Sequence, residues 1–367
     1  GVVRESSPIM GSDLGTTLDL ELQSVAESAM GDASGTVVAM EPDSGAVRVL
    51  YSAPSFDPNA FVGRLSRADW QQLAEDPRHP LQDRSTRGVY PPGSTVKPFY
   101  LLAGLAEGVI SPRSTVTCNG SVTLYGHRFR CWRREGHGVV GAVRSLEVSC
   151  DVYYYLLGYR LGIERMAPWL SRFSFGKSTG IGFSTEATGL IGSPEWSRRV
   201  RGTPWYPGEA ISVAIGQGPV LTTALQLARA YSALANGGRQ VTPHLVEPAR
   251  VQPAEDLDVN PRHLEIAVEG LRQVVHGSEG TARFLSVLSM AGKTGTAQVA
   301  RLQEGVEVED LAPHLRHHAW FVGWAPLEDP QLVVVVIVEH GGGGGGVAAP
   351  VAAAVIREAL GEAALVG

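Results

Sequence analysis

The 367-residue sequence contains no apolar run long enough to cross a membrane and no segment with the pattern of a secretory signal peptide. The apolar, β-branched run at residues 332–338 (LVVVVIV) is too short to span and instead predicts a buried central strand. The formal net charge of −6 comes without a basic cluster, which argues against nucleic acid as a partner. Cysteine is scarce, and the odd count of three cannot be fully paired in disulfides. These absences leave a globular domain that is long enough to bury a large core.

Two stretches that draw the eye lack the partners that a binding motif needs. Six consecutive glycines at residues 341–346 have no Gly-Lys-Ser/Thr ending, so they are not a phosphate-binding loop. We interpret them as a flexible connection between the last strand and the last helix. His314, His317 and His318 have no cysteine or clustered carboxylate to complete a ligand set, and we expect a solvated or partly buried loop.

Two short motifs carry the chemistry: S-x-x-K at residues 94–97 and K-T-G at residues 293–295. A serine hydroxyl is a weak nucleophile at neutral pH and needs an adjacent base. Residues three apart share a helix face, so we expect Ser94 and Lys97 to meet at a helix start. Lys97 can act as the base if burial or a second cation, such as Lys293, lowers its pKa. Each motif alone is weak, but the pair in this order is typical of enzymes that penicillin acylates.

Over nearly its whole length the chain resembles the transpeptidase domain of class B penicillin-binding proteins. It is most similar to the penicillin-binding protein 2 group, elongation-specific peptidoglycan D,D-transpeptidases that maintain rod shape. Besides the motifs, the resemblance rests on residues 76–81 (DPRHPL), 88–94 (GVYPPGS), 128–132 (RFRCW), 215–218 (IGQG) and 235–238 (ANGG). It implies an α/β (α+β) fold of the penicillin-binding and β-lactamase type. In that fold an antiparallel sheet is sandwiched by helices, and an all-helical subdomain completes the active site.

The resemblance implies that a D-Ala-D-Ala stem peptide of peptidoglycan acylates Ser94. D-Ala leaves, and an amine from a neighbouring stem peptide then attacks the acyl-enzyme. β-Lactams would acylate the same serine and leave slowly. By position, Lys293, Thr294 and Thr296 would bind the terminal carboxylate of the substrate. The backbone amides of Ser94 and Thr296 would form the oxyanion hole, and Gly295 would let the substrate backbone lie close to its strand.

A third segment, Ser149-Cys150-Asp151, resembles the S-x-N motif of the same family, with Asp151 in the asparagine position. Ser149 would relay a proton between Lys97 and the leaving amine, and Asp151 would hold the lysine and the substrate amide. The departure matters because an ionised aspartate only accepts hydrogen bonds, whereas asparagine also donates. The alternative is that Ser149 is the N-cap of the helix that follows.

Cys118, Cys131, His137 and Cys150 all lie in the segment that leads into this third motif. Three thiolates and one imidazole form a complete tetrahedral set for zinc, although the spacing lacks a C-x-x-C knuckle. A zinc ion with four protein ligands would have a structural role, and some members of the group hold a metal at a corresponding loop. The alternatives are a Cys118–Cys131 disulfide with Cys150 as a small buried residue, or three reduced cysteines.

Residues 1–15 are expected to be the remnant of a linker from a missing N-terminal pedestal, and residues 16–367 the transpeptidase domain. The resemblance implies the periplasmic face of the bacterial inner membrane, with a single-pass anchor upstream of this chain. It also implies a membrane glycan polymerase of the SEDS type as a partner of the missing N-terminal region. No nucleic acid partner is expected.

Periodicity places these motifs on a scaffold in which early and late strands join one antiparallel sheet. We expect strands at 36–40, 47–51, 293–298, 318–323 and 332–338, and helices from residues near 22, 67, 151, 227 and 351. Alternation would place Trp320 and Trp324 on one face.

Other functional classes share part of this chemistry. A serine β-lactamase would use Ser94, Lys97 and Lys293 but must also activate a water for deacylation, and no motif for that is evident. A non-enzymatic β-lactam sensor domain would acylate and stop. A zinc-stabilised structural domain would leave the catalytic pair without a role.

Overall fold

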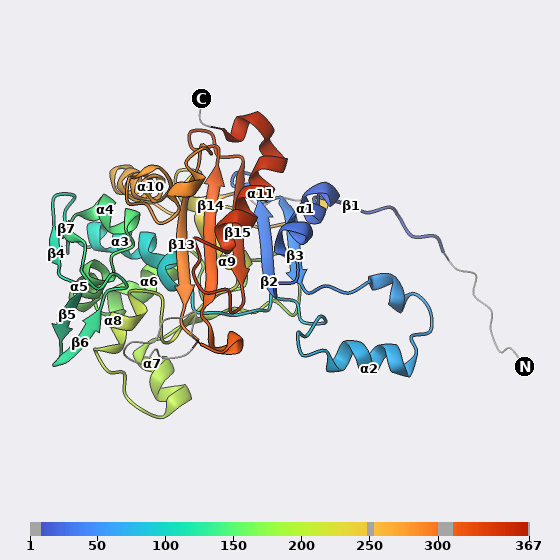
Figure 1. The fold of residues 1–367 in the computed structure, drawn as a ribbon, viewed down its shortest axis with the longest axis horizontal. Helices are drawn as coiled ribbons and strands as arrows, with labels where there is room; N and C mark the ends of the chain where they lie inside the picture. Colours follow the sequence, from blue (N-terminus) through green and yellow to red (C-terminus); the bar gives the residue numbers. More distant parts are fainter. Residues whose placement is uncertain (1–8, 248–252, 300–310, 366–367) are drawn as a thin grey trace, which may run out of the picture.

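The computed structural model describes residues 9–247, 253–299 and 311–365. Its centre is a five-stranded antiparallel sheet in the order β13-β14-β15-β2-β3 (Figure 1). The strands are β2 (Gly35–Met40), β3 (Val47–Ala53), β13 (Ala291–Ala297), β14 (His318–Ala325) and β15 (Leu332–Val338). The predicted joining of early and late strands in one sheet is thereby confirmed.

Both faces of the sheet are covered, so the central strand β15 is buried along its whole length. Alternate residues of the sheet enter two separate hydrophobic cores. One core contains α1 (Leu20–Met30) and α11 (Ala348–Leu360), and the other contains α9 (Ala224–Ala235). Trp320 and Trp324 both lie in the second core, as their alternation predicted.

A helical subdomain lies beyond the edge strand β13 (Figure 1). It contains α3 (Lys97–Ala106), α4 (Ala142–Glu147), α5 (Asp151–Leu161), α6 (Ile163–Arg172) and α8 (Glu209–Val213). Helix α10 (Pro261–His276) packs against both α4 and β13 and so joins the subdomain to the sheet. The subdomain also has two small antiparallel pairs, β4 (Val116–Cys118) with β7 (Gly138–Val140) and β5 (Ser121–Leu124) with β6 (His127–Arg130). These strands were not expected, because three or four residues are too few for an alternating pattern to stand out.

The remaining elements are short or peripheral. Helix α2 (Arg67–Glu75) has no buried residue and lies apart from the sheet in Figure 1. The final helix, expected from near residue 351, begins slightly earlier, at Ala348, and ends at Leu360. In the part of the chain that the structure describes, no helix is both long and apolar enough to cross a membrane. The other elements are β1 (Gly15–Thr16), which pairs with β11 (Val246–Glu247); β8 (Leu190–Ile191), with β9 (Val220–Leu221); β10 (Arg239–Gln240), with β12 (Glu255–Asp256); and α7 (Pro194–Trp196).

Candidate active site

Ser94 lies on a tight turn that leads directly into helix α3. Residues 93–96 form a 3-10 turn, and α3 begins at Lys97. Gly93 has a φ of 55°, and a Cβ there would lie 2.6 Å from the carbonyl oxygen of Thr296, so glycine is required. The turn leaves Ser94 partly exposed, whereas the three residues after it are buried. Partial exposure suits a nucleophile, which must reach a substrate.

The ammonium group of Lys97 is fully buried and points into the third motif. Its Nζ donates to Asp151 Oδ1 at 2.7 Å, to the Ser149 carbonyl oxygen at 2.9 Å and to Ser149 Oγ at 3.2 Å. The ring of Tyr154 also faces it, with Nζ 5.2 Å from the ring centroid. The expected contact with Ser94 is not present as a hydrogen bond between these two described side chains. The reason is that a carboxylate and two oxygens of Ser149 take up the N–H bonds of the ammonium.

Both carboxylate oxygens of Asp151 accept hydrogen bonds. Oδ1 accepts from Lys97, and Oδ2 accepts from the backbone N–H of Trp132 at 3.0 Å. In asparagine an NH₂ group replaces one of these two oxygens, so either Lys97 or the Trp132 N–H would face another donor. This pattern explains why an aspartate occupies a position where the resemblance expects asparagine. The side chains of Lys97 and Asp151 are only 0% and 12% exposed, so the pair is largely desolvated.

Ser149 does not cap helix α5, which corrects the alternative interpretation of this residue. The N-cap position of α5 is Cys150, and its side chain makes no capping hydrogen bond. Ser149 instead has a φ of 51°, a left-handed conformation that is uncommon for a residue with a side chain. This backbone conformation directs the Ser149 hydroxyl and carbonyl oxygens at Lys97.

Lys293, on the edge strand β13, is also fully buried, and its Nζ donates to the carbonyl oxygen of Thr294 at 3.1 Å. Burial, and secondarily the charge of Lys97, hold the pKa of Lys293 well below its usual value. The charge of Lys97 thus acts on the pKa of Lys293. The two ammonium groups have different partners, because Lys97 donates to the Asp151 carboxylate, whereas Lys293 donates to a neutral carbonyl oxygen.

The outer edge of β13 turns backbone groups toward the Ser94 turn. The carbonyl oxygen of Thr296 accepts from Gln217 Nε2 at 3.0 Å, and Gln217 Oε1 accepts from the N–H of Gln298 at 3.4 Å. Strand β14 lies on the other side of β13, so Thr296 points its backbone groups away from the sheet. The N–H and C=O of one residue in an antiparallel strand point the same way, so the Thr296 amide faces this edge too. An oxyanion hole that includes this amide requires such an orientation.

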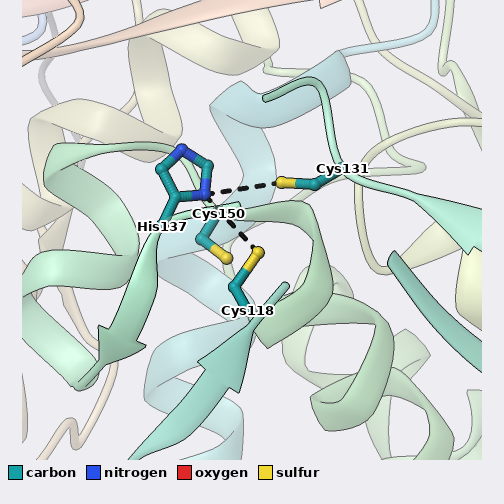
Figure 2. Close-up of side chains that lie close together, drawn as sticks. All are labelled: Cys118, Cys131, His137 and Cys150. Carbon is teal, nitrogen blue, oxygen red and sulfur yellow. Dashed lines mark hydrogen bonds between the residues drawn. The ribbon is translucent and has the colours of Figure 1, made fainter. Parts of the chain in front are cut away.

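The structure brings together the four predicted metal ligands, which Figure 2 shows facing one another. Their ligand atoms all lie within 4.8 Å of one another, and His137 Nδ1 is 3.7 Å from Cys118 Sγ and 3.5 Å from Cys131 Sγ. A tetrahedral zinc ion with bonds of about 2.3 Å to sulfur and about 2.0 Å to nitrogen sets these atoms roughly 3.6 Å apart. All three cysteines are buried free thiols, so the alternative Cys118–Cys131 disulfide is absent here. The donor set therefore fits zinc.

Two thiols of the cluster, those of Cys131 and Cys150, shift each other's pKa in opposite directions. A hydrogen bond from Cys150 holds the pKa of Cys131 well below its usual range. The same hydrogen bond, together with burial, raises the pKa of Cys150. A bound divalent cation would favour the thiolate form of these cysteines.

Trp132 connects the cluster to the catalytic motif. It follows Cys131 directly, and its ring packs on His137 with the centroids 5.3 Å apart. Its backbone N–H donates to Asp151 Oδ2, and its Nε1 donates to the carbonyl oxygen of Val148 at 3.1 Å. Displacement of the cluster would therefore move the partner of Asp151.

Residues 35–357 match the family model of the penicillin-binding protein transpeptidase domain. The chain belongs to this family. It is 37% identical over 339 residues to the peptidoglycan D,D-transpeptidase MrdA of Acinetobacter baumannii, covering 89% of this chain and 50% of that protein. It is 37% identical over 347 residues to MrdA of Escherichia coli K12, covering 90% and 55% respectively. The chain thus spans about half the length of the curated relatives it matches.

Solved structures of the family share this architecture. Penicillin-binding protein 2 of Pseudomonas aeruginosa, in complex with WCK 5153, matches with a TM-score of 0.89 and 40% identity. That match covers 99% of this chain and 79% of the Pseudomonas chain. Penicillin-binding protein 2 of Helicobacter pylori, in complex with MreC, matches with a TM-score of 0.87 and 30% identity over 95% of this chain and 64% of that one. The penicillin-binding transpeptidase fold of this chain is therefore established.

In this family member the glycine run packs against the back of β13, which corrects its interpretation as a merely flexible connection. Gly344 is buried, and a Cβ there would lie 2.2 Å from the carbonyl oxygen of Trp320 and 2.4 Å from that of Gly295. On the opposite face, a Cβ at Gly295 would lie 2.8 Å from Thr95 Cγ2 and 3.1 Å from the Pro92 carbonyl oxygen. Backbone segments therefore approach β13 closely from both sides at the K-T-G motif.

Three residues that shape the site were not singled out from the sequence: Gln217, Trp132 and Thr281. Thr281 Oγ1 lies 2.7 Å from Thr294 Oγ1, within hydrogen-bond distance. Gln217 and Trp132 lie in stretches that carried the family resemblance, which was the available signal for them. Thr281 follows α10 in a stretch without a motif.

Proposed function

We propose that this chain is the catalytic domain of a peptidoglycan D,D-transpeptidase that cross-links stem peptides during cell elongation. The observation that carries the proposal is the convergence of three motifs. The Ser94 turn, the Lys97–Ser149–Asp151 network and the outer edge of β13 come together where the sheet meets the helical subdomain.

In the acylation step, Ser94 Oγ forms a bond to the carbonyl carbon of the penultimate D-Ala, and the bond from that carbon to the leaving amine breaks. The Lys97 ammonium passes a proton through Ser149 Oγ, 3.2 Å from Lys97 Nζ, to the departing nitrogen, and it takes the proton of Ser94 in exchange. The amides of Ser94 and Thr296 stabilise the oxyanion, and removing such a donor typically costs about 100- to 1000-fold in rate.

The substrate's terminal carboxylate binds at β13 through Lys293, Thr294 and Thr296. Thr294 Oγ1 is held by Thr281, which fixes its rotamer before substrate arrives. In the second step an amine nitrogen attacks the acyl carbon, the ester bond to Ser94 breaks, and the proton returns to Ser94 Oγ through Lys97. β-Lactams acylate Ser94 by the first step and block the second.

Intact-protein mass spectrometry after incubation with benzylpenicillin tests this assignment. The wild type and Ser55→Ala, a control at an exposed serine, should gain one penicilloyl adduct, and Ser94→Ala should gain none. An adduct on Ser94→Ala would overturn Ser94 as the nucleophile. An adduct that hydrolyses within seconds would favour a serine β-lactamase over a transpeptidase. A stable adduct, together with no transfer of the acyl group from a D-alanyl thioester to any amine, would favour a sensor domain.

We further propose that Cys118, Cys131, His137 and Cys150 hold one structural zinc ion. When bound, the ion would neutralise the thiolates and fix the loop that carries Trp132, and hence the acceptor geometry of Asp151. Elemental analysis should give one zinc per chain. Cys118→Ser should lower both the zinc content and the melting temperature. The control variant His127→Gln, at an exposed residue of β6, should change neither. Metal-free protein with an unchanged melting temperature, or a mass two hydrogens lower from a disulfide, would contradict the zinc site.

Residues 16–367 are proposed to be the transpeptidase domain, with residues 1–15 leading to an upstream pedestal and a single-pass anchor at the periplasmic face of the inner membrane. The relatives are longer than this chain, and related solved structures include a complex with MreC and a peptidoglycan synthase complex. We propose a SEDS-type glycan polymerase as the partner of the upstream region. Co-purification should succeed with the full-length protein and fail with residues 16–367 alone.

A further inference from the structure

A groove lies beside the candidate site, between the loop after β6 and the segment after α10. Its volume is about 590 Å³, and it is lined by Trp132, Arg133, Glu279, Thr281, Arg283 and Phe284. It belongs to none of the three catalytic motifs, and no role in the proposed acylation step uses it.

The two walls of the groove are tied to the two sides of the active site. Thr281, on one wall, pairs with Thr294 of β13 through their hydroxyls. Trp132, on the other wall, donates its backbone N–H to Asp151. The groove therefore begins where the proposed binding site for the substrate's terminal carboxylate ends.

The groove combines aromatic surface with a surplus of positive charge. Trp132 and Phe284 are 58% and 53% exposed, which is high for large aromatic side chains beside a catalytic cleft. Glu279 is bound by the guanidinium groups of both Arg133 and Arg144, so its charge is already neutralised. Arg283 is exposed; one of its terminal nitrogens donates to the Ser278 carbonyl oxygen, and no described carboxylate pairs with it. A ligand with a carboxylate and an apolar stem complements these walls.

We propose that this groove binds the acceptor stem peptide, an amine-bearing peptide with a carboxylate next to its nucleophilic amine. The proposal rests on the proposed transpeptidase function. The amine replaces the leaving D-Ala, so it must enter from the end of the cleft where that residue's carboxylate lay, which is the Thr294 end. The amine nitrogen then bonds to the acyl carbon as the ester bond to Ser94 breaks. Arg283 binds the adjacent carboxylate, and Trp132 and Phe284 pack on the stem.

The test separates the acceptor half of the reaction from the donor half. A D-alanyl thioester acylates the enzyme, and the ratio of aminolysis to hydrolysis is measured against a stem tripeptide that ends in a diamino acid with a free carboxylate. The amidated tripeptide is the second acceptor. Acylation by benzylpenicillin, which uses no acceptor, reports the donor half in every variant.

In Arg283→Ala the rate of aminolysis should fall about tenfold more than the rate of acylation, because a charge-assisted hydrogen bond is lost. The variant should also no longer prefer the tripeptide with the free carboxylate over the amidated tripeptide. Arg283→Lys should restore part of that preference. Phe284→Ala should weaken both acceptors equally. The matched control is Arg262→Ala, an exposed arginine at the far end of α10, which should behave as the wild type.

An unchanged aminolysis ratio in both Arg283→Ala and Phe284→Ala would overturn the groove assignment while leaving the acylation chemistry intact. So would a wild type that is acylated by the thioester but whose penicilloyl form binds no tripeptide in calorimetry. A wild type that neither the thioester nor penicillin acylates would instead contradict the proposed function itself.

Discussion

Replacing Gly344 with alanine is expected to slow acylation of Ser94, although Gly344 lies on the far face of β13. The new Cβ would lie 2.2 Å and 2.4 Å from two backbone oxygens, whereas real Cβ contacts are essentially never under 3.0 Å. The backbones must therefore separate by 0.8 Å (3.0 − 2.2) at Trp320 and 0.6 Å (3.0 − 2.4) at Gly295. Strand β13 cannot simply retreat, because Thr95 and Pro92 contact Gly295 from the other face.

Such overpacking typically costs about 1–3 kcal/mol of stability. Displacement of the Thr296 amide by roughly the same distance acts on the oxyanion hole, where misplacement by ~1 Å can cost about 100-fold in rate. We therefore expect a drop of roughly 10- to 100-fold in the rate constant of the acylation step, with a smaller change in the dissociation constant of the initial complex.

The assay is stopped-flow acylation by a fluorescent penicillin, which separates initial binding from the chemical step, together with thermal unfolding. Gly346→Ala is the matched control, because nothing lies within 4 Å of a Cβ there and neither glycine has a left-handed φ. If Gly344→Ala acylates as fast as Gly346→Ala, the glycine run does not position β13. If it only melts earlier, with an unchanged chemical step in the folded fraction, its role is stability alone.

Two further predictions concern buried charge. Asp151→Asn leaves either the Lys97 ammonium or the Trp132 N–H facing an amide donor. The free energy of unfolding, measured in urea, should therefore fall by about 3–5 kcal/mol. An unchanged urea midpoint would contradict the explanation that both oxygens of Asp151 are needed as acceptors. Burial, then the charge of nearby His340, lowers the pKa of His318 from 6.5 to about 4, so the unfolded chain binds the proton first as the pH falls. Stability from this group is complete above pH 6.5 and should fall by up to ~3 kcal/mol toward pH 4. His318→Gln should flatten that slope in urea titrations, whereas His127→Gln should retain it.

The sheet was predictable because its strands carry their own pattern. Residues 333–338 are β-branched throughout, and the alternation of Trp320 and Trp324 assigned them correctly to one core. The four candidate metal ligands were likewise found from residue types and their placement before the third motif, and the structure brings them together. The zinc ion itself remains a prediction.

The partners of the catalytic groups were not predictable, because they come from tertiary contacts. The spacing predicted that Lys97 contacts Ser94, but the Lys97 ammonium instead donates to the carboxylate of Asp151, which comes from another helix. A run of glycines has the same sequence whether it forms a mobile link or a tightly packed segment. The structure distinguishes the two, because backbone oxygens lie close to Gly344. Thr281 had no signal, since a lone threonine after a helix has no pattern that predicts a partner.

The register of the sheet has a consequence for how the chain is made. Val37 of β2 pairs with Val336 of β15, a separation of 299 residues (336 − 37). The hairpin of β2 and β3 therefore cannot pair with β15 until synthesis of the chain is nearly complete. The cysteine–histidine cluster, by contrast, draws its ligands from residues 118–150 and can close while the ribosome is still adding the later strands. The lysine–aspartate network can therefore be assembled early in biosynthesis. The K-T-G side of the candidate site, on β13, is added only when the last three strands dock beside the first two.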